Sequence, residues 1–422
     1  MPVELSPEDR ALLDGRRGEA ARLAMRIVAE MAEVMGADRM IDVVSAHVDG
    51  CLYHGQASLD FAERLVAGGA TVSVPTTLNV GSLDLLHPGL VRESPERAEA
   101  ARRLMDLYVE MGCRPTWTCA PYQLPDRPKF GQHVAWAESN AIVFANSVLG
   151  ARTSRYGDFI DVCAAITGRA PLAGLHRDGD RRAEVVFRLS GIPERLLDED
   201  VLYPVLGHLI GREVGTAVPA IVGLPADVGE DRLKALGAAA ASSGSVALFH
   251  AVGVTPEAPT LQAALGGGAP AREVAVTTEM LRAARDELST TSRTDLAGVS
   301  LGTPHFSISE FEALVPLLDG AHAHPGVELY VSTGRDVLAE VERRGWLRPL
   351  QEAGAQVVTD TCTYITPIIR GSGGPVMTNS AKWAWYAPAN IGASVVFGSL
   401  EECVRSAVLG RVWRDERLWA DG

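Results

Sequence analysis

Short apolar runs recur along this chain, and each one ends in a cluster of small or polar residues before a helix-like segment begins. The runs lie at 40–48, 70–74, 297–301, 327–331 and 355–358. Alternating strand and helix signals are typical of an α/β protein with mainly parallel sheets. In such folds, ligands bind at the carboxyl ends of the strands. We therefore predict an α/β fold and look for the functional site in the polar clusters.

The middle of the chain differs in amino-acid composition from its ends. Residues 181–290 are rich in Ala and Gly, and these glycines are expected at close-packing and turn positions. A length of 422 residues is enough for roughly two to three ordinary domains. We predict three α/β lobes, at 1–180, 181–290 and 291–422, with an amphipathic helical lead-in over residues 6–35.

The chain is acidic, with a net charge of −14 and 47% hydrophobic residues. Nucleic-acid phosphates are bound by basic surfaces, so this charge argues against a nucleic-acid partner. A small anionic substrate is compatible with it, because a local cationic pocket can lie in an acidic protein. The first residues have no signal-peptide pattern, and no apolar run approaches the ~18 residues of a membrane span. We expect a cytoplasmic protein without a membrane partner.

Six cysteines are spread along the chain without a CxxC pair. This spacing is typical of free thiols in a reducing compartment, and it means that any metal site must be assembled from distant segments. Cys113, Cys163 and Cys403 lie in apolar helical contexts, which favours core packing. Cys119 and Cys362 lie in polar breaks of the chain. For these two, a small buried side chain, a metal ligand and a nucleophile all stay open.

The stretch 112–155 is dense in polar groups for a segment with so many apolar residues. Burying polar groups without partners is costly, so this density indicates a pocket. We predict a helix over 135–151, on which Ser139 and Asn146 share a face and Glu138 lies one step aside. The alternative is a buried helix whose polar residues cap neighbouring loops, and for Asn146 it is equally well supported.

Two further residues are candidates for chemistry. Lys382 lies in the polar segment TNSAK, where it can bind a carboxylate or phosphate, or simply extend to solvent. His305 follows Pro304 after a predicted strand and is a candidate acid or base.

Several blocks of sequence, taken in order, resemble one known family. The blocks are VPTTLN at 74–79, TCAPY at 118–122, the segment 128–155, ALFHAVGVTPEA at 247–258, DTCT at 360–363 and TNSAK at 378–382. Over nearly the whole chain they resemble the catalytic domain, or large subunit, of aconitase X. The resemblance implies a multi-lobed aconitase-like fold with the active site between lobes. It also implies dehydration of a substrate such as cis-3-hydroxyproline or phosphomevalonate at an iron or iron–sulfur centre.

Carried over residue by residue, the resemblance implies metal thiolates at Cys119 and Cys362. The family's third cysteine, in a Gly-Cys-Pro-His motif, is Thr303 here. A threonine does not replace a thiolate on an iron–sulfur cluster. Cys51 is the candidate for a substitute third thiolate. The chain is thus a divergent member, and a three-thiolate cluster, a two-cysteine mononuclear iron site and a metal-free site all stay open.

The same resemblance, together with the predicted helix face, gives a set of site residues. The predicted substrate-binding residues are Gly50, Cys51, Leu52, Asn79, Ser139, Asn146, Ser380 and Lys382, and the predicted acid–base residues are Lys382, Glu138, His305 and Tyr122.

Dehydratases of this family also have a small swivelling domain, fused or separate, and this sequence ends at Gly422 without one. We predict a hydro-lyase that acts on a small hydroxy acid, with a hydroxyproline-type imino acid as a candidate and a separate swivelling subunit as a candidate partner. One alternative is a metal-free lyase, isomerase or cyclase. The other is a non-catalytic large subunit that binds a small acid or waits for its small partner.

Overall fold

Two compact units, each with its own parallel sheets, make up the chain. The structure is a computed structural model that describes residues 3–370 and 373–420. The first unit comprises Met1–Leu83 and Glu93–Arg182, and the second comprises Asp84–Arg92 and Ala183–Gly422. The predicted lobes 181–290 and 291–422 therefore lie in one unit, together with a short segment from the first third of the chain.

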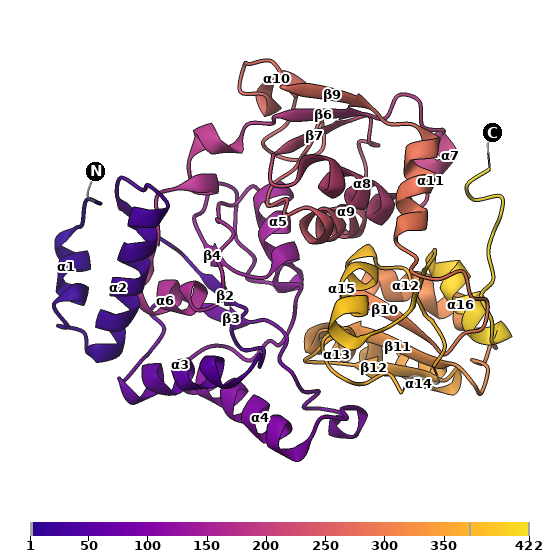
Figure 1. Ribbon diagram of the computed structural model, residues 1–422, viewed down its shortest axis with the longest axis horizontal. Coiled ribbons are helices and arrows are strands. Elements are labelled where there is room, and N and C mark those ends of the chain that lie inside the picture. The colour runs from indigo at the N-terminus through magenta and orange to yellow at the C-terminus, as the bar shows by residue number, and fades with distance from the viewer. Residues whose placement is uncertain (1–2, 371–372, 421–422) are drawn as a thin grey trace. The chain divides into compact units, whose positions relative to one another are not determined.

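The first unit is built on a three-stranded parallel sheet with the order β3-β2-β4, and helices pack around it (Figure 1). A separate antiparallel pair joins β1 to β5. The elements of this unit are α1 (Pro7–Leu13), α2 (Glu19–Val34), β1 (Met40–Asp42), β2 (Ala46–Val48), α3 (Gln56–Ala67), β3 (Thr76–Leu78), α4 (Pro95–Glu110), η2 (Pro121–Gln123), β4 (Ala135–Trp136), α5 (Ser139–Ser147), α6 (Ile160–Thr167), β5 (Arg169–Pro171), η3 (Gly174–His176) and η4 (Asp178–Arg181).

The predicted helical lead-in is confirmed as two helices, α1 and α2. Ser6 begins α1 with a capping box, in which its hydroxyl accepts from the Asp9 amide at 3.1 Å and its own amide donates to the Asp9 carboxylate at 2.8 Å. The two helices are separated by a turn in which Gly15 and Gly18 have positive φ.

Two sequence predictions are wrong in this unit. The strand expected at 70–74 lies instead at Thr76–Leu78, because the amides of Val72 and Ser73 bond to the carbonyls of Met111 and Ala165, at the C-terminal ends of α4 and α6, and not to a neighbouring strand. The helix expected over 135–151 is shorter. Residues Ala135–Trp136 form β4, and α5 begins only at Ser139, because Glu138 has a φ of 73° that no α-helix accepts.

The second unit contains a four-stranded parallel sheet, β8-β7-β6-β9, and a five-stranded parallel sheet, β12-β11-β10-β13-β14. The strands predicted at 297–301, 327–331 and 355–358 are confirmed as β10, β11 and β12. The elements are η1 (Pro88–Leu90), β6 (Val185–Arg188), α7 (Glu194–Leu197), α8 (Leu202–Val214), β7 (Pro219–Val222), α9 (Glu230–Ser243), β8 (His250–Ala251), α10 (Leu261–Ala264), β9 (Arg272–Ala275), α11 (Thr278–Glu287), β10 (Gly298–Phe306), α12 (Ile308–Leu318), β11 (Glu328–Thr333), α13 (Arg335–Arg343), α14 (Leu347–Glu352), β12 (Ala355–Val358), β13 (Val376–Thr378), α15 (Ala381–Ile391), β14 (Val395–Phe397) and α16 (Leu400–Leu409).

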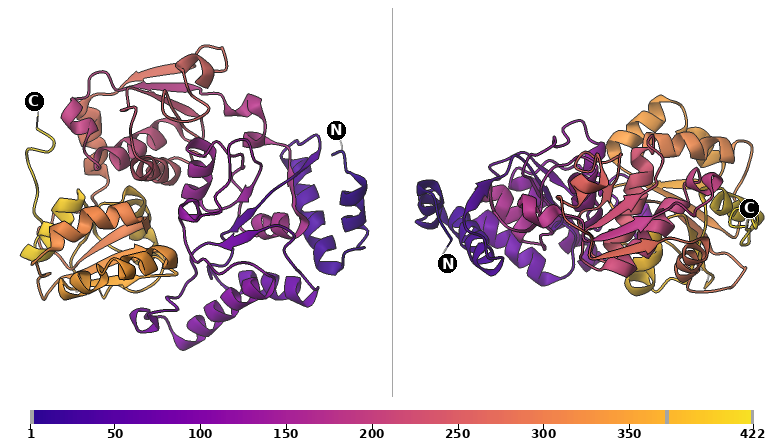
Figure 2. Two further views of the ribbon diagram at one scale, coloured as in Figure 1. Left: turned by 180° about the vertical axis from the view of Figure 1, so that it is seen from behind. Right: turned by 90° about the horizontal axis from the view of Figure 1, so that it is seen from above.

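Helices cover both faces of the five-stranded sheet (Figures 1 and 2). On one face, α12, α13, α14 and α16 bury apolar side chains such as Phe311, Leu350 and Val404 against Val299 and Leu329 of the sheet. On the other face lies α15, which also packs on α9. A strand covered on both faces is mainly apolar, and the apolar runs within β10, β11 and β12 make these strands recognisable from sequence.

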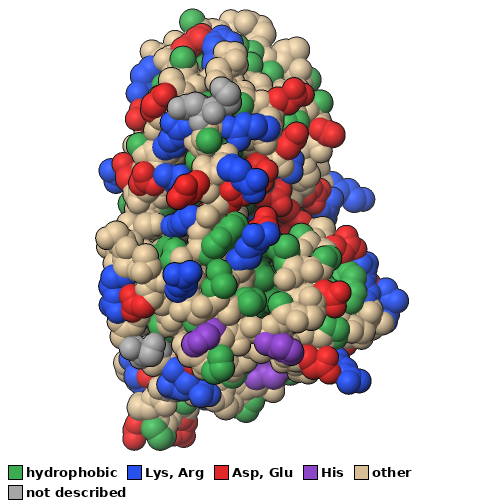
Figure 3. Space-filling view, turned by 90° about the vertical axis from the view of Figure 1, so that its right-hand side faces the viewer, with side chains coloured by type: hydrophobic (Ala, Val, Ile, Leu, Met, Phe, Trp, Pro, Cys, Tyr) green, Lys and Arg blue, Asp and Glu red, His purple; other side chains and the backbone are tan. Residues whose placement is uncertain are grey.

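The surface is rich in ion pairs between exposed side chains. The face drawn in Figure 3 shows basic and acidic side chains interspersed with hydrophobic ones. Exposed pairs such as Arg348–Glu352, with 2.7 Å between Nε and Oε1, contribute little to stability, because water screens the charges. Within residues 3–370 and 373–420, no helix is both long and apolar enough to cross a membrane.

Helices α8 and α9 approach each other closely enough to require glycine. A Cβ added at Gly207 would lie 2.1 Å from the Leu236 carbonyl oxygen, which no real side chain tolerates. The prediction that glycines of the middle region serve close packing is confirmed here.

We expect Gly207→Ala to lower the free energy of unfolding by about 1–3 kcal/mol, because the helices must separate to admit the methyl group. Gly89→Ala is the control, since nothing lies within 4 Å of a Cβ at that position. Urea denaturation measures both variants, and equal midpoints would contradict the close-packing role.

Candidate active site

The carboxyl edge of the first unit's sheet gathers most of the site residues predicted there. Asp49 and Gly50 follow β2, Asn79 follows β3, and Glu138 follows β4. Because the three strands are parallel, these ends lie on the same edge. The polar clusters after the apolar runs thus come together, as the α/β pattern predicted.

Cys119 is held beside this edge by its neighbours in sequence and by α5. The amide of Thr118 donates to the Leu78 carbonyl at 3.2 Å, which places the cysteine next to the end of β3. The side-chain amide of Asn140 donates to the Cys119 carbonyl at 2.8 Å. Cys119 is buried, with 2% of its surface exposed.

Glu138 caps helix α5. Its carboxylate accepts from the backbone amides of Asn140 and Ala141 at 3.0 and 2.9 Å, and from the hydroxyl of Ser139 at 3.2 Å. A carboxylate at a helix N-terminus is stabilised by the unpaired amides and by the helix dipole. The predicted acid–base residue therefore has a structural task that the sequence did not reveal.

Tyr122 and Asn146 also use their polar atoms inside the first unit. The Tyr122 hydroxyl donates to the Asn140 side chain, and its ring stacks on Phe144 with centroids 3.8 Å apart. The Asn146 amide group donates to the Thr153 carbonyl at 2.9 Å and accepts from the Thr153 amide at 3.0 Å. For Asn146, the geometry is that of the alternative interpretation, in which the side chain fastens a neighbouring loop.

Cys51, the candidate third thiolate, faces backbone carbonyls. Its Sγ lies 3.4 Å from the carbonyl oxygen of Asn79, 3.6 Å from that of Val48 and 3.7 Å from that of Val80. Burial, with the nearby Asp49 and Asp161 carboxyls, raises the pKa of the Cys51 thiol well above its usual range. In this position Cys51 is a neutral thiol, and a metal would require it to turn away.

Two carboxyls meet at the Gly50 loop, the partly buried Asp49 within the loop and the fully buried Asp161 of α6, and sequence reasoning missed both. Asp161 of α6 accepts from the backbone amides of Asp49 at 2.7 Å and Gly50 at 3.3 Å, which fixes the loop. The Asp49 carboxyl is hydrogen-bonded to the Asn79 side chain. The one signal in the sequence was the position of Asp49 directly after a predicted strand, where site residues are expected.

Burial and the neighbouring Glu138 carboxylate raise the pKa of Asp49 to about 8. Burial and the Asp158 carboxylate raise the pKa of Asp161 to about 7. Carboxyls of this kind titrate near neutrality, as general bases do.

In the second unit, the carboxyl edge of the five-stranded sheet brings together residues from three strands. His305 lies near the end of β10, Cys362 follows β12, and Ser380 and Lys382 follow β13. The Nε2 atom of His305 lies 3.7 Å from Cys362 Sγ and 3.3 Å from the Thr361 carbonyl oxygen. Both side chains are fully buried.

The loop that carries Cys362 is fixed by two buried carboxylates. Asp360, with a φ of 62°, accepts hydrogen bonds from Nε and Nη2 of Arg335 at 2.6 and 2.8 Å. Asp84, from the short segment 84–92, accepts from the amide of Thr359 at 2.9 Å and from its hydroxyl at 3.0 Å. Bidentate pairs of this kind hold geometry as well as charge.

Thr303 stands where the family pattern has its third cysteine. Its carbonyl accepts from the Ser380 hydroxyl, which also caps α15 through the Trp383 amide at 3.0 Å. Among the described residues, the Thr303 hydroxyl has no hydrogen-bond partner, although the residue is only 5% exposed. An unpaired buried hydroxyl is costly, which indicates a partner supplied from outside the chain.

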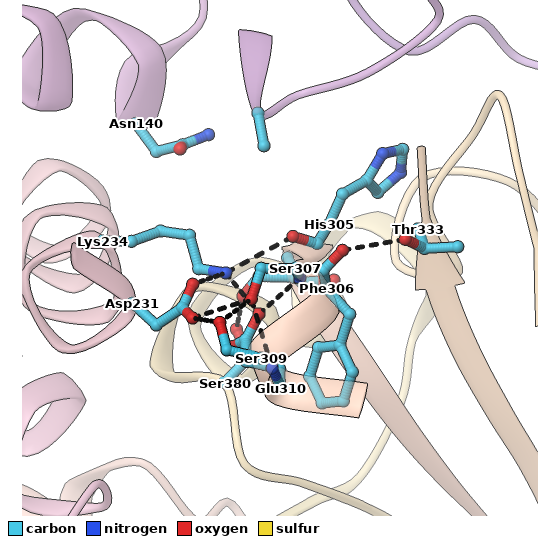
Figure 4. Close-up of polar contacts among 12 residues, drawn as sticks. Asn140, Asp231, Lys234, His305, Phe306, Ser307, Ser309, Glu310, Thr333 and Ser380 are labelled. Atoms are coloured by element: carbon cyan, nitrogen blue, oxygen red, sulfur yellow. Dashed lines mark hydrogen bonds and ion pairs between the residues drawn. The ribbon is translucent and has the colours of Figure 1, made fainter. Parts of the chain in front are cut away.

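Two buried lysines lie near His305. Lys382, 2% exposed, stands in the first turn of α15. Lys234 of α9 contacts the His305 carbonyl and two carboxylates (Figure 4). Burial lowers the pKa of His305 to about 4, and both ammonium groups add to this. The imidazole is therefore neutral at pH 7.

The donor types and their spacing fit a metal ion. Two ligands at about 2.3 Å (sulfur) and 2.1 Å (nitrogen) from one tetrahedral ion are about 3.6 Å apart, close to the 3.7 Å between Cys362 Sγ and His305 Nε2. A thiolate and a neutral imidazole are ligands that iron accepts. The orphaned Thr303 hydroxyl is consistent with a further bound group.

Family models match nearly all of this chain. The aconitase X first domain matches residues 2–179, the second domain 183–286 and the third domain 296–409. Cis-3-hydroxy-L-proline dehydratase of Pseudomonas aeruginosa is 48% identical over 406 residues, which are 96% of this chain and 70% of that protein. The chain belongs to the aconitase X family. The predicted family is thereby confirmed.

Archaeal relatives support the same conclusion. The phosphomevalonate dehydratase large subunit of Methanothermobacter thermautotrophicus is 36% identical over 96% of this chain and 98% of that protein. The crystal structure of Thermococcus kodakaraensis aconitase X in its holo-form superposes with a TM-score of 0.86 at 33% identity, over 96% of this chain and all of that one. The predicted aconitase-like α/β fold with mainly parallel sheets is confirmed, and the named relatives are hydro-lyases.

The raised pKa of Asp49 gives a testable pH dependence. A carboxyl that holds its proton up to about pH 8 when folded, but only to about pH 4 when unfolded, stabilises the fold at low pH. That contribution is lost as pH rises from about 4 to 8. Compared with Asp49→Asn, the wild type should lose up to about 1.4 kcal/mol of unfolding free energy per pH unit.

Denaturation of both proteins between pH 5 and 8.5 measures this difference. Asp126→Asn, which removes an exposed carboxylate of the same unit, is the control. A constant offset between wild type and Asp49→Asn across the range would show that Asp49 is ionised throughout.

Proposed function

We propose that this protein is a hydro-lyase that removes water from a small hydroxy acid, with a hydroxyproline-type imino acid as the first candidate substrate. The observation that carries the proposal is the buried Cys362–His305 pair, beside Lys382, at the carboxyl edge of a parallel sheet. The substrate class is supported by the 48% identity of this chain to a cis-3-hydroxy-L-proline dehydratase. A phosphorylated hydroxy acid is the second candidate, since the archaeal relatives are phosphomevalonate dehydratases.

In this proposal, Cys362 and His305 would hold an iron centre, and the family resemblance implies Cys119 as a further thiolate. Such a centre, when bound, acts as a Lewis acid on the leaving hydroxyl. With Thr303 in place of the third cysteine and Cys51 turned to backbone carbonyls, two thiolates favour mononuclear iron over a three-thiolate cluster.

The chain's own residues bind the acid group of the substrate. Lys382 is a buried cation in the first turn of α15, where the helix dipole also favours an anion. Ser380 positions that turn through its bonds to Trp383 and Thr303. In the first unit, Asn79, Ser139 and the Gly50–Cys51–Leu52 loop are the proposed contacts for the remainder of the substrate.

Asp49 is the proposed base that removes the proton next to the carboxylate. It lies at the end of β2, it is bonded to Asn79, and its pKa of about 8 is close to the pH at which such a base works. Glu138 and Tyr122 are occupied by the cap of α5 and by Asn140, so they rank behind Asp49.

Anaerobically purified protein tests the proposal with cis-3-hydroxy-L-proline as substrate. We expect Cys362→Ala and Cys119→Ala each to lose iron and to fall below about 1% of wild-type kcat/KM, because a lost ligand costs more than the 10–100-fold of a lost outer partner. Cys403→Ala, which removes a buried thiol on α16, is the control. Full turnover in Cys362→Ala would reject the iron centre and favour a metal-free lyase or isomerase.

A small partner subunit is also proposed, because the archaeal relatives are named large subunits. The assay therefore compares recombinant chain with chain purified from its natural source. Equal iron content with turnover only in the natural preparation would indicate the partner. Substrate binding without turnover in both preparations would indicate a non-catalytic protein.

The orphaned hydroxyl of Thr303 gives an independent prediction. We expect Thr303→Val to leave the free energy of unfolding unchanged or to raise it by up to about 3 kcal/mol, because an unpaired buried hydroxyl is removed. Turnover should fall about 10–100-fold if that hydroxyl serves the bound group.

Thr366→Val is the matched control, since its hydroxyl is buried and bonded to Thr361. That variant should lose stability, as expected when a made hydrogen bond is broken. Loss of stability in Thr303→Val as well would show that its hydroxyl has a partner within the fold.

A further inference from the structure

A buried ammonium group lies directly behind the turn that carries His305. Lys234 projects from α9, and 2% of its side chain is exposed. Its Nζ contacts Asp231 Oδ1 at 2.9 Å, the Glu310 carboxylate, and the His305 carbonyl oxygen at 3.4 Å. In Figure 4, the His305 carbonyl points toward Lys234 and its imidazole points to the opposite side.

The partners of Lys234 are the groups that begin helix α12. Glu310 accepts from the Ser307 amide at 2.8 Å in a capping box. Asp231, next to Lys234 on α9, accepts from the hydroxyls of Ser307 at 2.7 Å and Ser309 at 2.6 Å. One ammonium group and one carboxylate of α9 therefore hold the whole turn from His305 to Glu310.

Every donor of this ammonium group is in use. An ammonium has three N–H bonds, and three acceptors surround it. Lys234 thus has no donor left for a substrate, unlike a lysine that binds or attacks one. Buried ion pairs are weak contributors to stability, because desolvation offsets most of the attraction. The ion pairs of Lys234 differ from an ordinary buried ion pair because the same ammonium group also contacts the His305 carbonyl.

We propose that Lys234 is a positioning residue of the active site, whose ammonium is a fixed internal cation around which the His305–Glu310 turn folds. Through this turn, α9 sets the place of the His305 imidazole beside Cys362. The effect on catalysis rests on the proposed function, whereas the effect on the Cys362 environment does not.

Chemical rescue tests this role without a substrate. In Lys234→Ala, the cation is missing and its cavity remains, so the turn should loosen and Cys362 should react with iodoacetamide about tenfold faster. The rate for Cys403, also buried in this unit, should not change. Methylammonium chloride should restore the wild-type Cys362 rate by filling the cavity, whereas sodium chloride at the same ionic strength should not. Mass spectrometry of the two cysteine peptides gives both rates.

A second variant tests the same role if Lys234→Ala does not fold. Lys234→Met with Glu310→Gln fills the volume and removes one unpaired carboxylate, and glutamine still serves a capping box. Cys362 should again be alkylated faster, now without rescue by methylammonium. Arg169→Ala is the stability control, because it breaks the buried contact with Asp9 in the first unit at 2.7 Å. It should leave the ratio of Cys362 to Cys403 rates unchanged.

Equal acceleration of both thiols in Lys234→Ala would overturn the proposal, since that is the signature of a general loss of stability. An unchanged Cys362 rate, or acceleration that methylammonium does not reverse, would overturn it as well. Where turnover is measurable, Lys234→Ala should lower kcat more than it raises KM, with recovery in methylammonium. Absence of wild-type turnover would count against the proposed function alone, because the alkylation rates still decide the role of Lys234.

Discussion

Parallel strand pairing is the constraint on which both groups of site residues depend. In a parallel sheet every strand ends at the same edge, so residues that follow different strands become neighbours whatever their separation in sequence. His305, Cys362 and Lys382 come together in this way after β10, β12 and β13. The same rule gathers Asp49 and Asn79 in the first unit. Helices on both faces then exclude water from the strands and bury these polar ends.

For a buried polar group, the presence or absence of a hydrogen-bond partner within the chain indicates whether the group serves the fold or can bind a ligand. Where every donor and acceptor is matched within the chain, as for Asn146 and Lys234, the residue holds structure together. Where a buried atom lacks a hydrogen-bond partner among the described residues, as for the Thr303 hydroxyl and the side-chain amide oxygen of Asn79, that atom can still bind another group. An unpaired buried polar atom costs stability. The Thr303 hydroxyl, two residues from His305 on β10, therefore supports a bound group more strongly than residue type alone.

The fold was largely predictable because several of its strands contain short apolar runs, and the failures have physical causes. Strands β10, β11 and β12 were found from their hydrophobic runs. Strand β3 was misplaced because its Thr-Thr-Leu sequence is largely polar and the apolar segment before it bonds to carbonyls at the ends of α4 and α6. Glu138 was read as part of a helix, since its positive φ leaves no trace in composition. Lys234 was missed because its partners lie some 70 residues away in sequence. Cys119 and Cys362 were singled out by the family resemblance more than by their spacing.

Electrostatics link the buried lysines to the chemistry proposed for His305. Complete burial, with a smaller effect of the two ammonium groups, lowers the pKa of this imidazole to about 4, so the ring is neutral at pH 7. A neutral ring keeps a lone pair for a metal or a hydrogen bond, and a protonated ring would not. Lys382 exerts this influence where an acid substrate is proposed to bind, and an anion bound there would partly cancel its charge. Lys234 is held by two carboxylates on the far side of the turn, so the chain's own residues fix its position.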